Sequence, residues 1–168
     1  MLGRKKMICR LKDGTEYTVR KAEDYEWDSA MELAYRVFLR FEAKDYGREG
    51  TDSFAQFLTN PLLEKMFHSG RYTVFVAVLE GELIGIGSLR NGNHLSLLFV
   101  DGDYHRNGVG TEIIKALQDF LLQETEYVTM TVNASPYGVP FYEHLSFESL
   151  GDFETLDGIT YMPMELYL

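Results

Sequence analysis

One segment, residues 94–110, restricts the fold of this chain more than any other. It reads HLSLLFVDGDYHRNGVG and leads directly into TEIIKALQDFLLQ. The pattern predicts a hydrophobic strand over His94–Val100, a glycine-bearing turn, and an amphipathic helix from about Gly108 to Gln123. The first backbone N–H groups of a helix have no partner within it, and the helix dipole places partial positive charge there. We therefore expect this turn to bind the phosphate groups of a ligand.

Two common phosphate-binding motifs do not fit the turn. A dinucleotide-binding fingerprint requires a further glycine three residues after Gly110, and Ile113 stands there. A P-loop requires Gly-Lys-Ser/Thr after four spacer residues, and this segment does not supply it. Both classes of nucleotide site are excluded.

The remainder of the chain predicts mainly antiparallel strands with helices between them. Asp13-Gly14 and Asp157-Gly158 are dipeptides typical of tight hairpin turns, and Asn60-Pro61 is typical of a helix start. One strand–helix–strand crossover favours a mixed sheet with helices on both faces, in a single domain over residues 1–168. Further strands are expected at 7–11, 16–20, 72–79, 83–90, 127–132, 147–155 and 159–168, and further helices at 28–41, 52–59, 61–68 and 136–145.

Composition limits the classes of partner. The net charge of −10 argues against nucleic acid and anionic membranes as partners; it would favour cationic substrates such as amines, and solubility explains it as well. Arg4, Lys5, Lys6 and Arg10 are not followed by the apolar stretch of a signal peptide, and no apolar run approaches transmembrane length. A single cysteine, Cys9, excludes an internal disulfide and a cysteine-rich metal site. We expect a cytoplasmic protein.

A second motif follows the next predicted strand: residues 133–147 read NASPYGVPFYEHLSF. Together with the turn HRNGVG, this segment resembles the GNAT superfamily of N-acetyltransferases over roughly His94–Phe147. The family pattern at the turn is Gln/Arg-x-x-Gly-x-Gly/Ala, and His105 here replaces the usual Gln or Arg. The resemblance implies an α/β (α+β) fold with a mixed, mainly antiparallel sheet of about seven strands. It also implies a splayed central parallel pair and about four helices on both faces.

The resemblance further implies that acetyl-coenzyme A is the cosubstrate and lies between the strands at 95–100 and 127–132. Its pantetheine arm would pair with the backbone of the first strand, and a backbone N–H there would face the thioester oxygen. Ser135 is also a natural cap before Pro136, and both interpretations stay open. The implied coenzyme-binding residues are Leu98, Phe99, Val100, His105, Arg106, Asn107, Gly108, Val109, Gly110, Thr111, Asn133 and Ser135.

Tyr142 is the implied catalytic residue, because the family places a tyrosine at this point of the helix beside the coenzyme sulfur. A phenol with a pKa near 10 suits proton donation to a departing thiolate. A core aromatic beside Phe141 and Leu145 is the alternative. Ser146 stands where the family usually has a glycine, which weakens the expected helix cap without touching the chemistry.

The residue that accepts the proton of the amine is left open. His94 is either a base or a strand-edge surface residue, and His68 and His144 look peripheral. An acidic group near the first two helices either attracts a cationic amine or is a solvated loop. No spacing of His, Asp and Glu predicts a metal site. The acidic group is Glu42, Asp45, Glu49 and Asp52.

These observations lead us to expect direct acetyl transfer from acetyl-coenzyme A to a primary amine of a small molecule, peptide or protein. No covalent enzyme intermediate is expected, because Cys9 lies outside the motif region. A non-catalytic coenzyme A sensor and an enzyme for another acyl chain are the alternatives. A homodimer is conceivable through apolar residues of the last strand, which core packing explains equally well: Tyr161, Met162, Met164 and Tyr167.

Overall fold

The computed structural model of the chain describes residues 5–168, so Arg4 lies outside the described residues. The strands are β1 (Lys6–Arg10), β2 (Glu16–Lys21), β3 (Thr73–Leu79), β4 (Glu82–Arg90), β5 (His94–Val100), β6 (Thr129–Ala134), β7 (Glu148–Ser149), β8 (Glu154–Leu156) and β9 (Ile159–Tyr167). The helices are α1 (Trp27–Phe41), α2 (Ala43–Leu58), α3 (Pro61–His68), α4 (Val109–Glu124) and α5 (Val139–His144).

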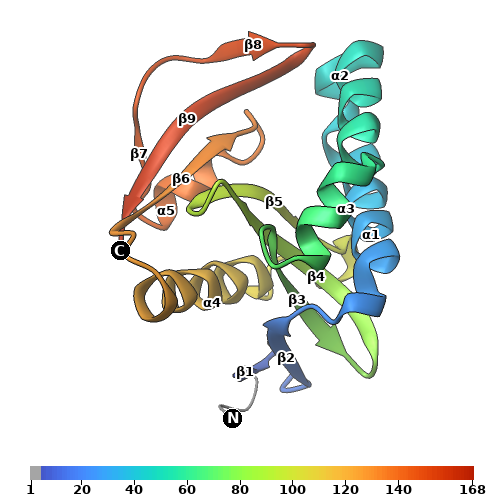
Figure 1. Cartoon of the computed structure of the whole chain (residues 1–168), viewed down its shortest axis with the longest axis vertical. Coiled ribbons are helices and arrows are strands. Elements are labelled where there is room, and N and C mark those ends of the chain that lie inside the picture. Colours follow the sequence, from blue (N-terminus) through green and yellow to red (C-terminus); the bar gives the residue numbers. More distant parts are fainter. Residues whose placement is uncertain (1–4) are drawn as a thin grey trace.

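One mixed sheet runs through the described residues in the order β1-β2-β3-β4-β5-β6-β9-β7, and β8 pairs with β9 (Figure 1). The neighbouring strands are antiparallel with one exception, the parallel pair β5–β6 that the crossover helix α4 connects. This arrangement is the GNAT-like fold, so the expected fold class is confirmed. The strand number exceeds the expected seven because the C-terminal segment divides into β7, β8 and β9.

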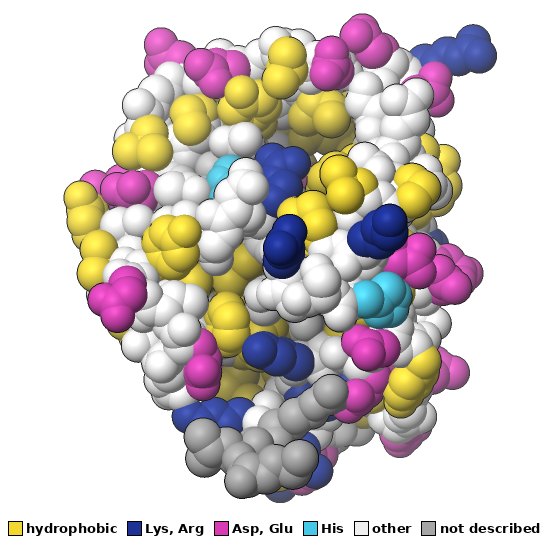
Figure 2. Space-filling model, in the orientation of Figure 1, with side chains coloured by type: hydrophobic (Ala, Val, Ile, Leu, Met, Phe, Trp, Pro, Cys, Tyr) yellow, Lys and Arg dark blue, Asp and Glu magenta, His cyan; other side chains and the backbone are white. Residues whose placement is uncertain are grey.

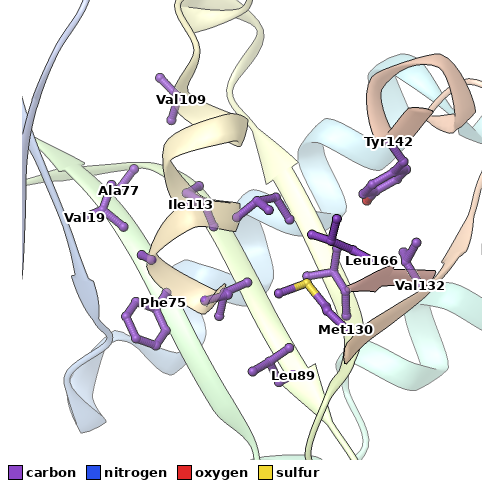
Figure 3. Packing of buried hydrophobic residues seen from close by; sticks show 14 of the residues in the cluster. Val19, Phe75, Ala77, Leu89, Val109, Ile113, Met130, Val132, Tyr142 and Leu166 are labelled. Carbon is purple, nitrogen blue, oxygen red and sulfur yellow. The ribbon is translucent and has the colours of Figure 1, made fainter. Parts of the chain in front are cut away.

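Helices cover both faces of the sheet. On one face α1, α2 and α3 lie side by side, and the apolar cluster beneath them includes Leu33, Val76 and Ile86 (Figure 1). On the other face α4 and α5 cover a second cluster, which joins helix residues such as Ile113 to strand residues such as Met130 (Figure 3). The central sheet therefore separates two cores, and a site that draws on helices from both faces needs an opening in the sheet.

Close packing of α4 on β4 depends on a glycine. A Cβ on Gly87 would overlap the side chain of Ile113, which is completely buried. Since the helix can approach the strand this closely, its N-terminus is held directly beside the end of β5. The fold thus fixes the position of the predicted phosphate-binding turn.

The hairpin turns and one helix start agree with the sequence. Asp157-Gly158 has positive φ at both residues (52° and 78°), as expected for the tight turn that joins β8 to β9. The side chain of Asn60 accepts a hydrogen bond from the backbone N–H of Leu62, and Pro61 occupies the first turn of α3. Asp13-Gly14 likewise lies between the antiparallel β1 and β2.

Several boundaries differ from the sequence prediction. α5 begins at Val139 instead of residue 136, and the strand expected at 147–155 is divided into β7 and β8. α2 begins at Ala43 instead of residue 52, because the polar segment before it continues as helix through a kink at Gly47, where φ is 66°. β6 spans Thr129–Ala134 instead of 127–132, since its register with β9 and β5 moves the pairing two residues along. Within residues 5–168, no helix is both long and apolar enough to cross a lipid bilayer.

Candidate active site

The central feature of the site is a gap between β5 and β6. These strands pair only at His94↔Thr131 and Leu95↔Val132, and beyond Leu95 they separate. The register between β4 and β5 shifts at the same point, which leaves Ser96 without a partner in the ladder. A bulge of this kind bends the strand and frees backbone hydrogen-bonding groups. The edge of β5 beyond Ser96 can therefore bind an extended ligand, as the predicted pantetheine contact requires.

A cavity of about 1360 Å³ opens at this gap. β5, the start of α4, the end of β6, α5 and the junction of α1 and α2 all contribute to its wall. All but one of the coenzyme-binding and catalytic residues implied by the family resemblance line it, and Asn107 is the exception. The lining residues among them are Leu98, Phe99, Val100, His105, Arg106, Gly108, Val109, Gly110, Thr111, Asn133, Ser135 and Tyr142.

The turn into α4 has the geometry of an anion site. Gly108 is the N-cap with φ 77°, a left-handed conformation that favours glycine even though a Cβ there would meet open space. The N–H of Glu112 donates to the carbonyl oxygen of Gly108 at 3.0 Å, the bond that closes the first turn of the helix. Val109, Gly110 and Thr111 come before Glu112 in the helix, so their N–H groups have no carbonyl partner within it. All three residues line the cavity.

His105 and Asn107 hold the turn in place. Nε2 of His105 lies 2.7 Å from the carbonyl oxygen of Val100, and the ring packs against Phe41 at a tilt of 36°, with centroids 4.6 Å apart. The side chain of Asn107 donates to the carbonyl oxygen of His105 and accepts from the backbone N–H of Lys12. Both side chains are thus engaged with protein atoms, which ties the turn to β5 and to the β1–β2 loop.

Tyr142 projects from α5 toward the sheet beside Val132 (Figure 3). Its ring is 8% exposed and packs edge-on against Phe141 and Phe147. Burial raises the pKa of its phenol, and the charges of Glu42 and Tyr46 raise it further. The residue is therefore both a core aromatic and a wall of the cavity, and its hydroxyl stays protonated at neutral pH.

The end of α5 positions Tyr142. The N–H of Phe147 donates to the carbonyl oxygen of Tyr142, and that of Ser146 donates to Glu143, each at 3.0 Å. This pair of bonds is the Schellman motif, and the ring contact between Tyr142 and Phe147 completes it. Ser146 adopts φ 74° in the motif, the position at which glycine is favoured. The expected cap forms in spite of the serine, at the cost of a left-handed conformation.

Within the acidic group, Glu42 is the residue that lines the cavity; Asp45, Glu49 and Asp52 are exposed. Glu42 lies at the junction of α1 and α2. Burial raises the pKa of its carboxyl group, a hydrogen bond with Ser135 lowers it, and the charge of Asp45 raises it. No sequence pattern separates Glu42 from its acidic neighbours, because the helix junction determines which of them faces inward.

Ser135 has two roles in the structure. Its hydroxyl accepts a hydrogen bond from the N–H of Gly138 at 3.0 Å, which caps the turn before α5. The same side chain interacts with Glu42 and Tyr46 in the cavity. The capping interpretation and the cavity interpretation are therefore compatible.

His94 lies inside the cavity wall, partly buried. Its Nδ1 is 2.9 Å from Oγ1 of Thr131, and burial followed by the charge of Arg90 lowers the pKa of the ring. Arg90 pairs with His94 across β4 and β5 and lines the same cavity. In Figure 2 a histidine and a basic side chain lie side by side where this face is hollowed, between the C-terminal strands and the α2–α3 pair. Sequence reasoning missed Arg90, since a charged residue at a strand end usually faces solvent.

The remaining candidates lie apart from the cavity centre. His68 is in α3 beside Glu64, and His144 is exposed and borders the cavity. Cys9 is buried in β1 and does not line the cavity. Among the described residues, no cluster of His, Cys, Asp and Glu has the arrangement needed to hold a metal ion.

Comparison with known proteins agrees with this geometry. A family model described as "Acetyltransferase (GNAT) domain" matches residues 42–168. The chain is 26% identical over 132 residues to the uncharacterized N-acetyltransferase YafP of Escherichia coli K12, with 79% of this chain and 81% of that protein covered.

Solved structures share the fold at lower identity. A GCN5-related N-acetyltransferase from Rhodopseudomonas palustris superposes with a TM-score of 0.78 and 20% identity, over 96% of this chain and 98% of that chain. The PaiA N-acetyltransferase of Thermoplasma acidophilum, solved in complex with coenzyme A, superposes with a TM-score of 0.74 and 17% identity, over 90% and 99%.

Proposed function

Because the chain belongs to the GNAT family of acetyltransferases, we propose that it transfers an acetyl group from acetyl-coenzyme A to a primary amine by direct attack. The observation that carries this proposal is the joint opening of three features into one cavity: the β5–β6 gap, the amides that begin α4, and the hydroxyl-bearing ring of Tyr142. The amides suit a diphosphate, the gap suits an extended arm, and Tyr142 suits a reacting thioester.

Coenzyme A fits the polar groups that the cavity offers. The N–H groups of Val109, Gly110 and Thr111 are donors for the diphosphate, and Arg106 and the Thr111 hydroxyl supply further donors. The position of Gly110 is tight, because a Cβ would lie 3.3 Å from the Phe141 ring. A larger residue there would push the phosphate or the ring away.

The chemistry requires movement of two protons. A protonated amine loses one proton before its nitrogen attacks the carbonyl carbon, and it loses a second as the new C–N bond forms and the C–S bond breaks. We assign acceptance of a proton to Glu42, whose raised pKa brings it closer to that of a proton acceptor at neutral pH. Tyr142 donates a proton to the sulfur as the thiolate leaves and recovers a proton from the amine nitrogen, while Glu42 passes the other proton of the amine to water. An N–H of β5 beyond Ser96 stabilises the oxyanion.

A non-catalytic coenzyme A sensor is the second candidate, and one observation favours it. His105, which replaces the family's Gln or Arg, is held by Val100 and Phe41 and is therefore engaged away from the diphosphate. The backbone amides could still bind coenzyme A without any transfer following.

Two measurements on the purified chain separate these functions. We expect calorimetry to detect coenzyme A binding, and a thiol assay to detect free coenzyme A released from acetyl-coenzyme A only when a suitable amine is present. Binding without release across a broad amine panel would favour the sensor. Faster release from propionyl- or succinyl-coenzyme A than from acetyl-coenzyme A would favour another acyl chain. Failure of coenzyme A to bind would remove both functions.

A further inference from the structure

Arg90, at the end of β4, is a cation without a counterion inside the cavity. Its guanidinium packs over the ring of Phe57 at 5.6 Å, and its Nε is buried with no hydrogen-bond partner. Among the described residues no carboxylate forms an ion pair with it. The residue as a whole is half-buried, and a buried donor such as this Nε is costly while it lacks an acceptor. The chain has an excess of carboxylates (net charge −10), so the lack of an ion pair at Arg90 does not come from a shortage of acidic residues.

Two neighbours of Arg90 also present donors. His94 pairs with Arg90 across the strands, and its Nδ1 contacts the Thr131 hydroxyl. In the tautomer in which Nδ1 accepts that hydroxyl proton, Nε2 carries the ring proton and can donate. Ser96 accepts from the hydroxyl of Tyr72 at 3.0 Å, so its own proton is available. All three line the cavity, and an anion with two acceptor oxygens matches such a group of donors.

This group of donors lies far from the phosphate-binding turn. His94 begins β5 and Val100 ends it, and six residues of strand span about 20 Å. The turn into α4 lies beyond Val100. Because the diphosphate is expected at the turn, an anion held near Arg90 would belong to a different molecule, the acceptor.

We propose that Arg90, His94 and Ser96 bind a carboxylate of the acceptor, so that the acceptor is a primary amine that also carries a carboxylate. The inference rests on the proposed acetyl transfer. The acceptor would then carry two charges, and the cavity offers an opposite charge for each: Glu42 for the ammonium and Arg90 for the carboxylate. Glu42 and Arg90 lie on different elements of the fold. The distance between them therefore sets the distance that the acceptor needs between its ammonium group and its carboxylate.

Matched acceptors test the inference. ω-Amino acids from glycine to 6-aminohexanoate, and lysine, are each compared with the amine that lacks the carboxylate (methylamine to pentylamine, and 1,5-diaminopentane). We expect kcat/KM to be at least tenfold higher for the best amino acid than for its partner amine. Arg90→Met should remove this preference through a rise in the KM of the amino acid, with the KM of acetyl-coenzyme A unchanged. Arg90→Lys should restore part of it.

Arg71→Met is the control, since Arg71 is exposed and does not line the cavity. This variant should prefer the amino acid over its partner amine as strongly as the wild type does. Equal kcat/KM within every pair, or an undiminished preference in Arg90→Met, would overturn the carboxylate site and leave acetyl transfer standing. Absence of turnover with any amine would instead overturn the proposed function.

In that case the ring signal of His94 is followed by NMR during titration with the same pairs. A shift with the amino acid alone, abolished by Arg90→Met, supports the site, and no shift overturns it.

Discussion

Glu42 acts on Tyr142 although the two residues come from opposite faces of the sheet: burial raises the pKa of the Tyr142 phenol, and the charge of Glu42 raises it further. Glu42 follows α1 on one face, and Tyr142 lies in α5 on the other. They can interact because β5 and β6 separate beyond Leu95, which opens the sheet between them. The splay of one parallel strand pair thus opens the cavity proposed for the coenzyme and also brings the candidate acid and base together in it.

Replacement of Tyr142 by Phe should lower kcat about 100-fold, the lower range for loss of a general acid, with little change in the affinity for coenzyme A. The ring and its packing against Phe147 remain, so the fold should be retained. Steady-state thiol release gives kcat, and calorimetry gives the affinity. Tyr167→Phe, at an exposed position, is the control. Unchanged turnover of Tyr142→Phe at every pH would refute the general-acid role.

Glu42→Gln should slow acetylation most at neutral pH, and it should also stabilise the fold there. Because burial raises the pKa of Glu42 above its ordinary 4.5 in the folded state, the folded chain binds the proton more tightly than the unfolded chain. Stability therefore falls as pH rises from 4.5 through the raised pKa. The Gln variant should show a higher Tm than the wild type at pH 7 and a similar Tm below pH 4.5.

Glu49→Gln, at an exposed position of α2, should leave both Tm and rate unchanged. If Glu42→Gln lowered Tm at pH 7, the carboxylate would be stabilising instead of desolvated, and its role as a proton acceptor with a raised pKa would have to be abandoned.

Ser146→Gly should stabilise the protein by about 1 kcal/mol, because glycine adopts φ 74° without the penalty of a side chain. The hydrogen bonds of the Schellman motif do not involve the serine side chain and should persist. Urea unfolding measures the change. Ser69 caps the end of α3 with φ −92°, so Ser69→Gly is a control in which no strain is relieved. Because it also removes the hydrogen bond from the Ser69 hydroxyl to the carbonyl oxygen of Met66, it should destabilise the protein. Equal effects at the two sites would contradict a strained conformation at Ser146.

The parts of the fold that were predicted depend on local patterns. The boundaries of β5 and the hairpin turn at Asp157-Gly158 follow from residues adjacent in sequence. The start of α2 was missed because Gly47 and Gly50 resemble a loop until the helix packs on the sheet. Hydrophobic periodicity is weak in such a polar segment.

The candidate site also has one part that sequence motifs predict and another part that only the fold reveals. The turn into α4 and Tyr142 belong to motifs that a sequence carries visibly. Arg90 was not among the candidates, and Glu42 could not be separated from the other acidic candidates near it. Each is one of many charged residues, and only strand register and a helix junction turn them inward. His105 was expected at the diphosphate, and its bond to Val100 depends on how the turn folds back on β5.

The most direct test of the account is an NMR titration of the ¹⁵N-labelled protein with coenzyme A. We predict that the amide signals of Gly108, Val109, Gly110 and Thr111 shift most strongly and saturate together, followed by those of β5 beyond Ser96. Saturable shifts elsewhere with these four amides unmoved, or no shifts at all, would contradict it.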